Sequence, residues 1–199
     1  MSFSLALVTA PAAEPLTRTE TKLHLRVDSS FTDDDSLIDA LITTARQHVE
    51  HHTRRALVTQ TWDLFLDAFP AGNEICVPLP PLQSVTSLKY TDSGGTVTTW
   101  STANYIVDTA HAPGRIVPVY GQYWPVFTPY PSNPVAVRFV AGYGAAAAVP
   151  EAVKAAMKLL IGHWYENREA VTGITNSSAL APVPLAVEAL LAPYRVWGF

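Results

Sequence analysis

The stretch Arg54–Pro70, RRALVTQTWDLFLDAFP, is where the hydrophobic pattern of the chain changes. Before it, apolar residues recur every three to four positions, which is the period of an amphipathic helix. From about Leu57, apolar and polar residues alternate, and β-branched and aromatic side chains become frequent, which is typical of a strand. The sequence therefore predicts a helical segment followed by a β-rich segment that begins near Leu57.

Two helices are predicted before this change. Thr17 and Glu20 have the spacing of a capping box, in which each side chain bonds to the backbone N–H of the other at a helix start. Thr32 is the expected cap of the second helix, because the three acidic residues Asp33–Asp35 that follow favour the positive end of a helix dipole. The second helix has an apolar stripe made by Ile38, Ile42, Ala45 and Val49.

Short strands are predicted up to about Val140, separated by prolines and a Ser-Gly-Gly turn. Proline cannot donate to a sheet ladder, so we expect a small antiparallel sheet with several loops. Helix resumes at Pro150, and a last short helix is expected around Leu185–Leu191. The resumed helix has one apolar seam, formed by Val153, Met157, Leu160 and Trp164.

The predicted fold class is α+β, with a helical bundle built from the N- and C-terminal segments and a small antiparallel β portion inserted between them. The expected parts are an N-terminal arm (1–16), the first half of the bundle (17–56), the β-rich insertion (57–144), the second half of the bundle (145–192) and a C-terminal tail (193–199).

The charge pattern argues against a protein that grips nucleic acid. The formal net charge is −4, and no run of Lys or Arg supplies the concentrated positive charge that phosphate binding needs. The single cysteine, Cys76, excludes an intramolecular disulfide and suits a reducing compartment. No apolar run approaches the roughly 20 residues that span a bilayer, so we expect no membrane partner.

Two motifs suggest a bound cofactor or metal, and neither is complete. Gly142, Gly144 and Ala147 fit G-x-G-x-x-A, but a dinucleotide site needs a helix directly after the glycines, and Pro150 delays it. His48 and His52 have a zinc-like helical spacing without a nearby third ligand. We therefore expect no cofactor and no metal. Cys76 is expected in a strand among apolar neighbours, where a thiol is usually inert.

The stretch Leu160–Ala170, LIGHWYENREA, has the residue density of an active site. His163 and Glu166 lie one helical turn apart and could share a proton. Trp164, however, belongs to the apolar seam, and Arg168 is placed to stack on its indole. We predict a packing or assembly network rather than catalytic residues. It consists of His163, Trp164, Tyr165, Glu166, Arg168 and Glu169. The alternative is a small hydrolase or metal-dependent enzyme using His163 and Glu166, or His48 and His52.

Six stretches, in this order and spacing, resemble the head–tail connector (adaptor) proteins of long-tailed bacteriophages and gene transfer agents. They are APAAEPLTRTETKLHLRV, RRALVTQTWDLFLDAFP, VPLPPLQSVTSLKYTD, PVAVRFVAGYG, VPEAVKAAMKLLIGHWYENREA and LLAPYR. The region Thr109–Asn133 matches least. The resemblance implies a non-enzymatic structural protein, made in the host cytoplasm, that forms a ring beneath the portal at the particle neck. By analogy the ring has twelve copies.

The resemblance also implies the partners. They are the portal protein, neighbouring copies of the chain, and a tail-proximal stopper or tail-terminator protein, while DNA passes through the channel without sequence-specific binding. A second alternative within the same neck is a stopper or tail-completion protein. The family suggests that the C-terminal tail reaches the portal through Tyr194, Arg195, Trp197 and Phe199. These residue types are favoured in binding hot spots. The other possibility is that the tail folds back onto its own helices.

Overall fold

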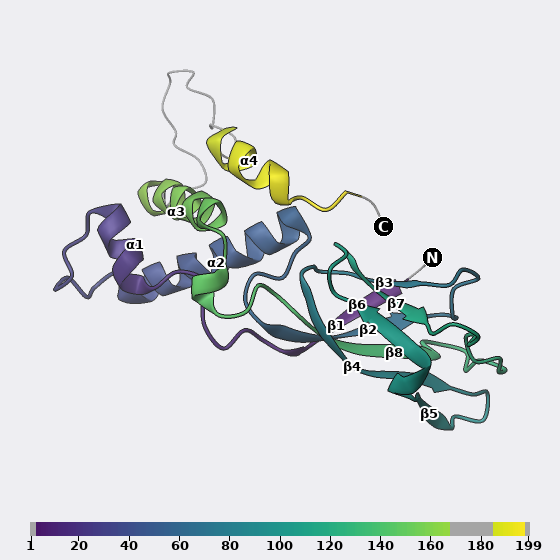
Figure 1. Cartoon of the computed structure of the whole chain (residues 1–199). Coiled ribbons are helices and arrows are strands. Elements are labelled where there is room, and N and C mark those ends of the chain that lie inside the picture. Colours follow the sequence, from purple (N-terminus) through teal and green to yellow (C-terminus); the bar gives the residue numbers. More distant parts are fainter. Residues whose placement is uncertain (1–2, 168–184, 198–199) are drawn as a thin grey trace, which may run out of the picture. The chain divides into compact units, whose positions relative to one another are not determined.

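The computed structural model describes residues 3–167 and 185–197 of the chain. It divides into two compact units: a β unit of residues 1–12 and 58–144, and a helical unit of residues 13–57 and 145–199. The helical unit is thus built from two segments that the β-rich segment separates in the chain. The predicted α+β class is confirmed (Figure 1).

The β unit contains two antiparallel sheets. The five-stranded sheet has the order β1-β2-β8-β4-β5, and the three-stranded sheet has the order β3-β7-β6. The strands are β1 (Phe3–Thr9), β2 (Gln60–Leu66), β3 (Ile75–Val77), β4 (Leu82–Thr91), β5 (Val97–Trp100), β6 (Tyr105–Asp108), β7 (Gly114–Pro118) and β8 (Val135–Ala141). Of the residues expected as an N-terminal arm, residues 3–9 form a strand that pairs with β2 at the edge of the sheet.

Strand β8 lies in the middle of the larger sheet, paired with β2 on one side and β4 on the other. Its residues alternate between buried and less buried positions, as expected for a strand with one face on a core. The smaller sheet packs closely against this core, because a Cβ atom added at Gly114 would lie 2.5 Å from Leu82 of β4. The alternation in the sequence therefore selects which side chains the two sheets enclose.

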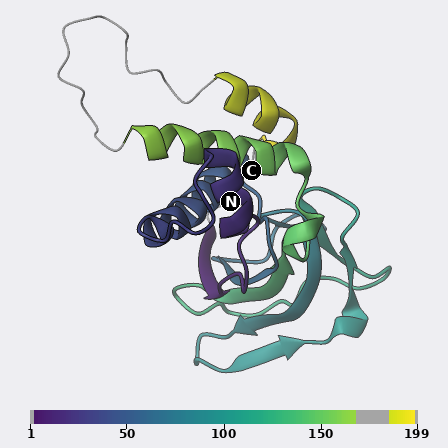
Figure 2. The ribbon, with the colours of Figure 1, turned by 90° about the vertical axis from the view of Figure 1, so that its left-hand side faces the viewer.

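The helical unit contains α1 (Arg18–Leu25), α2 (Asp35–Thr53), α3 (Glu151–Glu166) and α4 (Leu185–Leu191), followed by a 3-10 turn (Ala192–Tyr194). Helix α3 lies between α2 and α4 and contacts both (Figure 1, Figure 2). The apolar side chains that these helices bury are Ile38, Ile42, Ala45, Val49, Val153, Ala156, Met157, Leu160, Ile161, Val187 and Leu191. The predicted stripe and seam form this core, except that Trp164 is only half-buried.

The two helix starts predicted before Leu57 have different outcomes. The capping box is confirmed: the Thr17 N–H donates to the Glu20 carboxylate at 2.8 Å, and the Glu20 N–H donates to the Thr17 hydroxyl at 3.1 Å. The cap at Thr32 is wrong. The N-cap of α2 is Asp34, and the Thr32 carbonyl instead accepts from the Asp35 N–H, which closes a turn before the helix begins.

Gly142 gives the first prediction. Its φ is +119°, and a Cβ there would lie 2.5 Å from the Val58 carbonyl oxygen. Gly142→Ala therefore combines backbone strain with a clash against backbone atoms, and we expect a loss of roughly 2 kcal/mol or more in the free energy of unfolding, measured by denaturant titration. Gly72→Ala is the matched control, because nothing lies within 4 Å of its Cβ position. Equal stability of the two variants would contradict this account.

Candidate assembly surface

Helices α1 and α2 are joined by ion pairs, and the one made by Lys22 is buried. Lys22 is only 5% exposed, and its Nζ lies 2.5 Å from Asp35 Oδ1 and 2.6 Å from the Phe31 carbonyl oxygen. Arg18 bonds with Asp35 at 2.8 Å and also with Asp39. The bond from Lys22 holds the pKa of Asp35 below its usual value, with Arg18 adding to the effect. A charge buried without such partners would be costly, so these pairs fix how α1 lies on α2.

A second buried cation ties the entry segment to α2. Arg46 donates to Glu14 at 2.8 Å and to Glu50 at 2.7 Å. Burial by itself lowers the pKa of Arg46, but these bonds outweigh it and the net pKa is raised. Glu50 also accepts the Leu57 N–H at 2.9 Å, at the point where the helical segment ends. Neither cluster was predicted, because single charged residues on a helix give no sequence signal of their partners.

In the described part of the stretch LIGHWYENREA, residues 160–167, Trp164 and Tyr165 contact other helices of the same unit. The Trp164 ring meets the His48 ring edge-on, with centroids 5.8 Å apart, and the Tyr165 hydroxyl donates to the Asp34 carboxylate at 2.5 Å. A Cβ atom added at Gly162 would lie 3.6 Å from His24, so α1 passes close to this turn of α3. At Trp164 and Tyr165, the predicted network therefore packs within one subunit.

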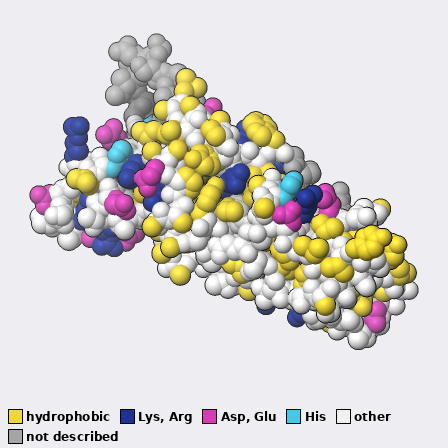
Figure 3. All heavy atoms as spheres, viewed as in Figure 1, with side chains coloured by type: hydrophobic (Ala, Val, Ile, Leu, Met, Phe, Trp, Pro, Cys, Tyr) yellow, Lys and Arg dark blue, Asp and Glu magenta, His cyan; other side chains and the backbone are white. Residues whose placement is uncertain are grey.

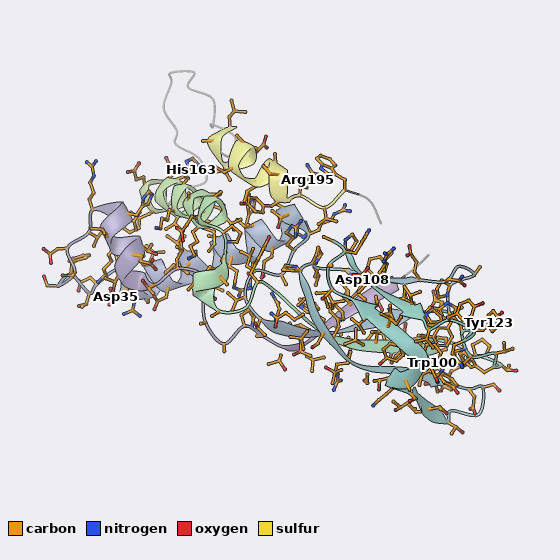
Figure 4. The ribbon with its side chains drawn as sticks, in the orientation of Figure 1. Asp35, Trp100, Asp108, Tyr123, His163 and Arg195 are labelled. Atoms are coloured by element: carbon orange, nitrogen blue, oxygen red, sulfur yellow. The ribbon has the colours of Figure 1, made fainter. Side chains whose placement is uncertain are left out.

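The proposed proton-sharing pair of the enzyme alternative lies at the end of α3. The His163 backbone carbonyl accepts from the Asn167 N–H at 3.1 Å and from the Asn167 side-chain amide at 2.8 Å, which closes the helix. Glu166 is exposed in the last turn. Figure 4 labels His163 at this end of the helix. Arg168 and Glu169, the other predicted members of the network, lie outside the described residues.

The zinc-like histidines stack on each other instead of forming part of a cluster of ligands. The His48 and His52 rings are parallel to within 10°, with centroids 6.4 Å apart. Within residues 3–167 and 185–197, no group of three His, Cys, Asp or Glu side chains could hold a metal ion. Burial lowers the pKa of His48, and the neighbouring His52 and His51 lower it further. These features favour a neutral packing histidine at position 48.

The glycine motif and the cysteine have structural explanations. Gly142 lies where the chain passes the backbone of Val58, and α3 begins only at Glu151. The helix N-terminus is thus too far along the chain to face a pyrophosphate held by the glycines. Cys76 lies in β3 as predicted, but its side chain is exposed rather than enclosed by apolar neighbours. Partial burial and the nearby Glu74 raise the pKa of its thiol, which disfavours the reactive thiolate.

The C-terminal segment folds back onto the helical unit through its backbone. The Val196 N–H donates to the Thr53 carbonyl at 3.0 Å, and Arg55 donates to the Tyr194 carbonyl at 2.5 Å. Val196 is buried, whereas Trp197 is 73% exposed with the Arg195 guanidinium 4.2 Å from its ring centre. The side chains of Arg195 and Trp197 therefore stay at the surface, while backbone hydrogen bonds fix this segment to the helical unit. Phe199 lies outside the described residues.

The region that matched the family least contains an aromatic cluster. Trp124 stacks on Phe69 with centroids 5.2 Å apart and lies 5.3 Å from Trp100, while Phe127 lies 4.9 Å from Tyr90. The Trp124 indole also donates to the Gly72 carbonyl at 2.8 Å. This cluster was not predicted, although the density of aromatic residues between Val119 and Asn133 is a signal for it.

No described helix is both long and apolar enough to cross a membrane. Comparison with known proteins gives a partial match to one family. Residues 17–91 match the family described as phage gp6-like head-tail connector protein. No curated protein sequence matches the chain.

Three solved structures are similar to nearly the whole chain. One is the neck of an empty gene transfer agent particle computed with C6 symmetry, at 27% identity and a TM-score of 0.76, covering 98% of this chain and 97% of that one. The second is the virion of a native gene transfer agent particle, at 26% identity and a TM-score of 0.76, covering 98% of this chain and 96% of that one. The third is the neck of the native particle computed with C12 symmetry, at 26% identity and a TM-score of 0.75, covering 98% of this chain and 97% of that one. The predicted resemblance to head–tail connector proteins is confirmed.

The low pKa of His48 gives the second prediction. An unfolded histidine titrates near 6.5 and the folded one lower, so the stability that neutral His48 contributes is complete above pH 6.5 and is lost as the pH falls through the folded pKa. We expect the free energy of unfolding to decrease between pH 7.5 and pH 5, and His48→Gln to weaken that decrease. His51 is exposed and supplies the control: His51→Gln should change the pH dependence of the free energy of unfolding less than His48→Gln does. An unchanged slope in His48→Gln would contradict the assignment.

Proposed function

We propose that this chain is a head–tail connector, a structural protein that forms a ring at the neck of a phage or gene transfer agent particle, beneath the portal. The observation that supports this most strongly is the similarity to neck structures over 98% of the chain, at 26–27% identity. The family match over residues 17–91 supports it independently from sequence. The ring extends the DNA channel and provides the platform on which the tail attaches.

The proposed partners are the portal protein, neighbouring copies of the chain and a tail-proximal stopper or tail terminator. Symmetric neck structures support a ring of copies, and C12 symmetry favours twelve. The mild net charge of −4 suits a channel through which DNA slides, because few cations are available to hold phosphates. A stopper or tail-completion protein is disfavoured by the connector family match.

The enzyme alternatives lose their structural basis at both pairs of residues. The His163 backbone carbonyl closes the end of α3, and Glu166 is exposed in the last turn. His48 packs against Trp164 and stacks on His52. We therefore assign His48 to packing within the helical unit.

The proposed function is tested by assembling particles without this chain and then supplying the chain again. Particles made without it are expected to be filled heads lacking tails, counted by electron microscopy, and the full chain should restore tailed particles. A chain carrying His163→Gln with Glu166→Gln should restore them equally well, because connection needs no proton transfer. Normal tailed particles in the absence of the chain would refute the connector role, and failure of a folded, incorporated double variant would favour chemistry.

For the C-terminal segment we propose contact with the portal through Tyr194, Arg195, Trp197 and Phe199. Trp197 and Arg195 lie at the surface beside each other, so they can meet a partner without leaving the helical unit. Trp197→Ala is expected to weaken binding to purified portal by roughly 10-fold or more, as measured by titration, while the thermal midpoint stays unchanged. Leu185→Ala is the control, since Leu185 is 80% exposed on α4. Equal binding by both variants would refute this role for the tail.

A further inference from the structure

A loop of the β unit presents large apolar side chains to solvent. It runs between β7 and β8, from Val119 to Asn133, and contains no Asp, Glu, Lys, Arg or His. Tyr120 and Val126 are fully exposed, and Tyr123 is 82% exposed. Figure 3 shows hydrophobic side chains gathered at the end of the β unit where Figure 4 labels Tyr123. Monomeric soluble proteins rarely expose a continuous apolar patch of this kind, which marks it as a contact surface.

The loop is held in place by the residues that alternate with the exposed ones. Trp124 stacks on Phe69, and Phe127 meets the Tyr90 ring. Backbone bonds add to this, since the Ser93 N–H donates to the Thr128 carbonyl at 2.8 Å. A surface fixed in this way loses little conformational entropy when it binds, so its exposed side chains can contribute to affinity. This is the arrangement expected of a preformed docking patch rather than a loose loop.

A second uncharged patch lies on strand β1 of the same unit. Its sequence, FSLALVT, has no charged residue, and β1 is an edge strand whose described pairing is with β2 alone. Leu7 and Val8 are 49% and 43% exposed. The pairing with β2 shifts register between Leu7 and Thr9, so the strand is irregular at Val8. Natural proteins usually protect such an edge with charge or proline, and here neither lies within the strand.

We propose that these two patches meet between neighbouring copies: the loop patch (Tyr120, Tyr123 and Val126) of one copy packs on the β1 patch (Leu7 and Val8) of the next. This rests on the proposed function. A closed ring needs two different surfaces on each subunit in heterologous contact, and these two patches supply such a pair. Both patches belong to one compact unit and lack charges, so their contact removes water from apolar surface without burying an ion.

The test places opposite charges on the two patches in the full chain. Leu7→Asp and Tyr123→Lys are each expected to reduce incorporation into particle necks by at least 10-fold, and the double variant should regain most of it through a new ion pair between copies. Val97→Asp is the control: Val97 is 60% exposed on β5 and lies outside both patches. Unfolding curves of every variant confirm that the charged side chains leave the fold intact.

Crosslinking on particles tests the contact directly. With Cys76→Ser as the background, Leu7→Cys combined with Tyr123→Cys should give a ladder of covalent oligomers on mild oxidation, while each single-cysteine chain gives at most dimers. Normal incorporation of both charged single variants, or no ladder from incorporated double-cysteine chains, would overturn the proposed contact and leave the connector role standing. Absence of the wild-type chain from necks would instead overturn the connector role itself.

Discussion

The apolar packing of α2 against α3 is the interaction on which the helical unit depends. The two helices are separated in the chain by the whole β-rich segment, so local propensity cannot bring them together. Ile38, Ile42 and Val49 from α2 and Met157 and Leu160 from α3 are almost completely buried. Removing this much apolar surface from water is the dominant favourable term in folding. Helix α4 then adds Val187 and Leu191 on the other side of α3.

Polar contacts decide how the remaining helical segments lie on this core. Lys22 joins α1 to the start of α2 through Asp35, and Arg46 joins the entry segment to the middle of α2 through Glu14. Apolar surfaces alone can slide over one another, whereas a buried ion must meet its partner. The dense stretch at the end of α3 acts in the same way, since Tyr165 bonds to Asp34. Tyr165, from a stretch that resembles a reaction site in the sequence, thus joins α3 to the start of α2.

Several parts of the fold could be predicted because they follow from local patterns. The change of period near Leu57, the capping box at Thr17 and the short helix Leu185–Leu191 all depend on residues close together in the chain. The cap at Thr32 was mispredicted because several polar residues compete to start α2, and turn geometry placed Asp34 there. The partners of Trp164 could not be predicted. The expected partner, Arg168, lies outside the described residues, and the structure places His48 of α2 against the Trp164 ring.

The sequence by itself determined the order of helices and strands, the faces that become buried, and the resemblance to connector proteins, because periodicity and motif order are properties of the chain. Only the tertiary structure decided which charged groups pair, that residues 3–9 join the sheet, and that the backbone of the C-terminal segment folds onto Thr53. It also decided which aromatic residues between Val119 and Asn133 turn inward and which stay exposed. These contacts join residues far apart in the chain, and their energies depend on distance and burial, which exist only once the chain has folded.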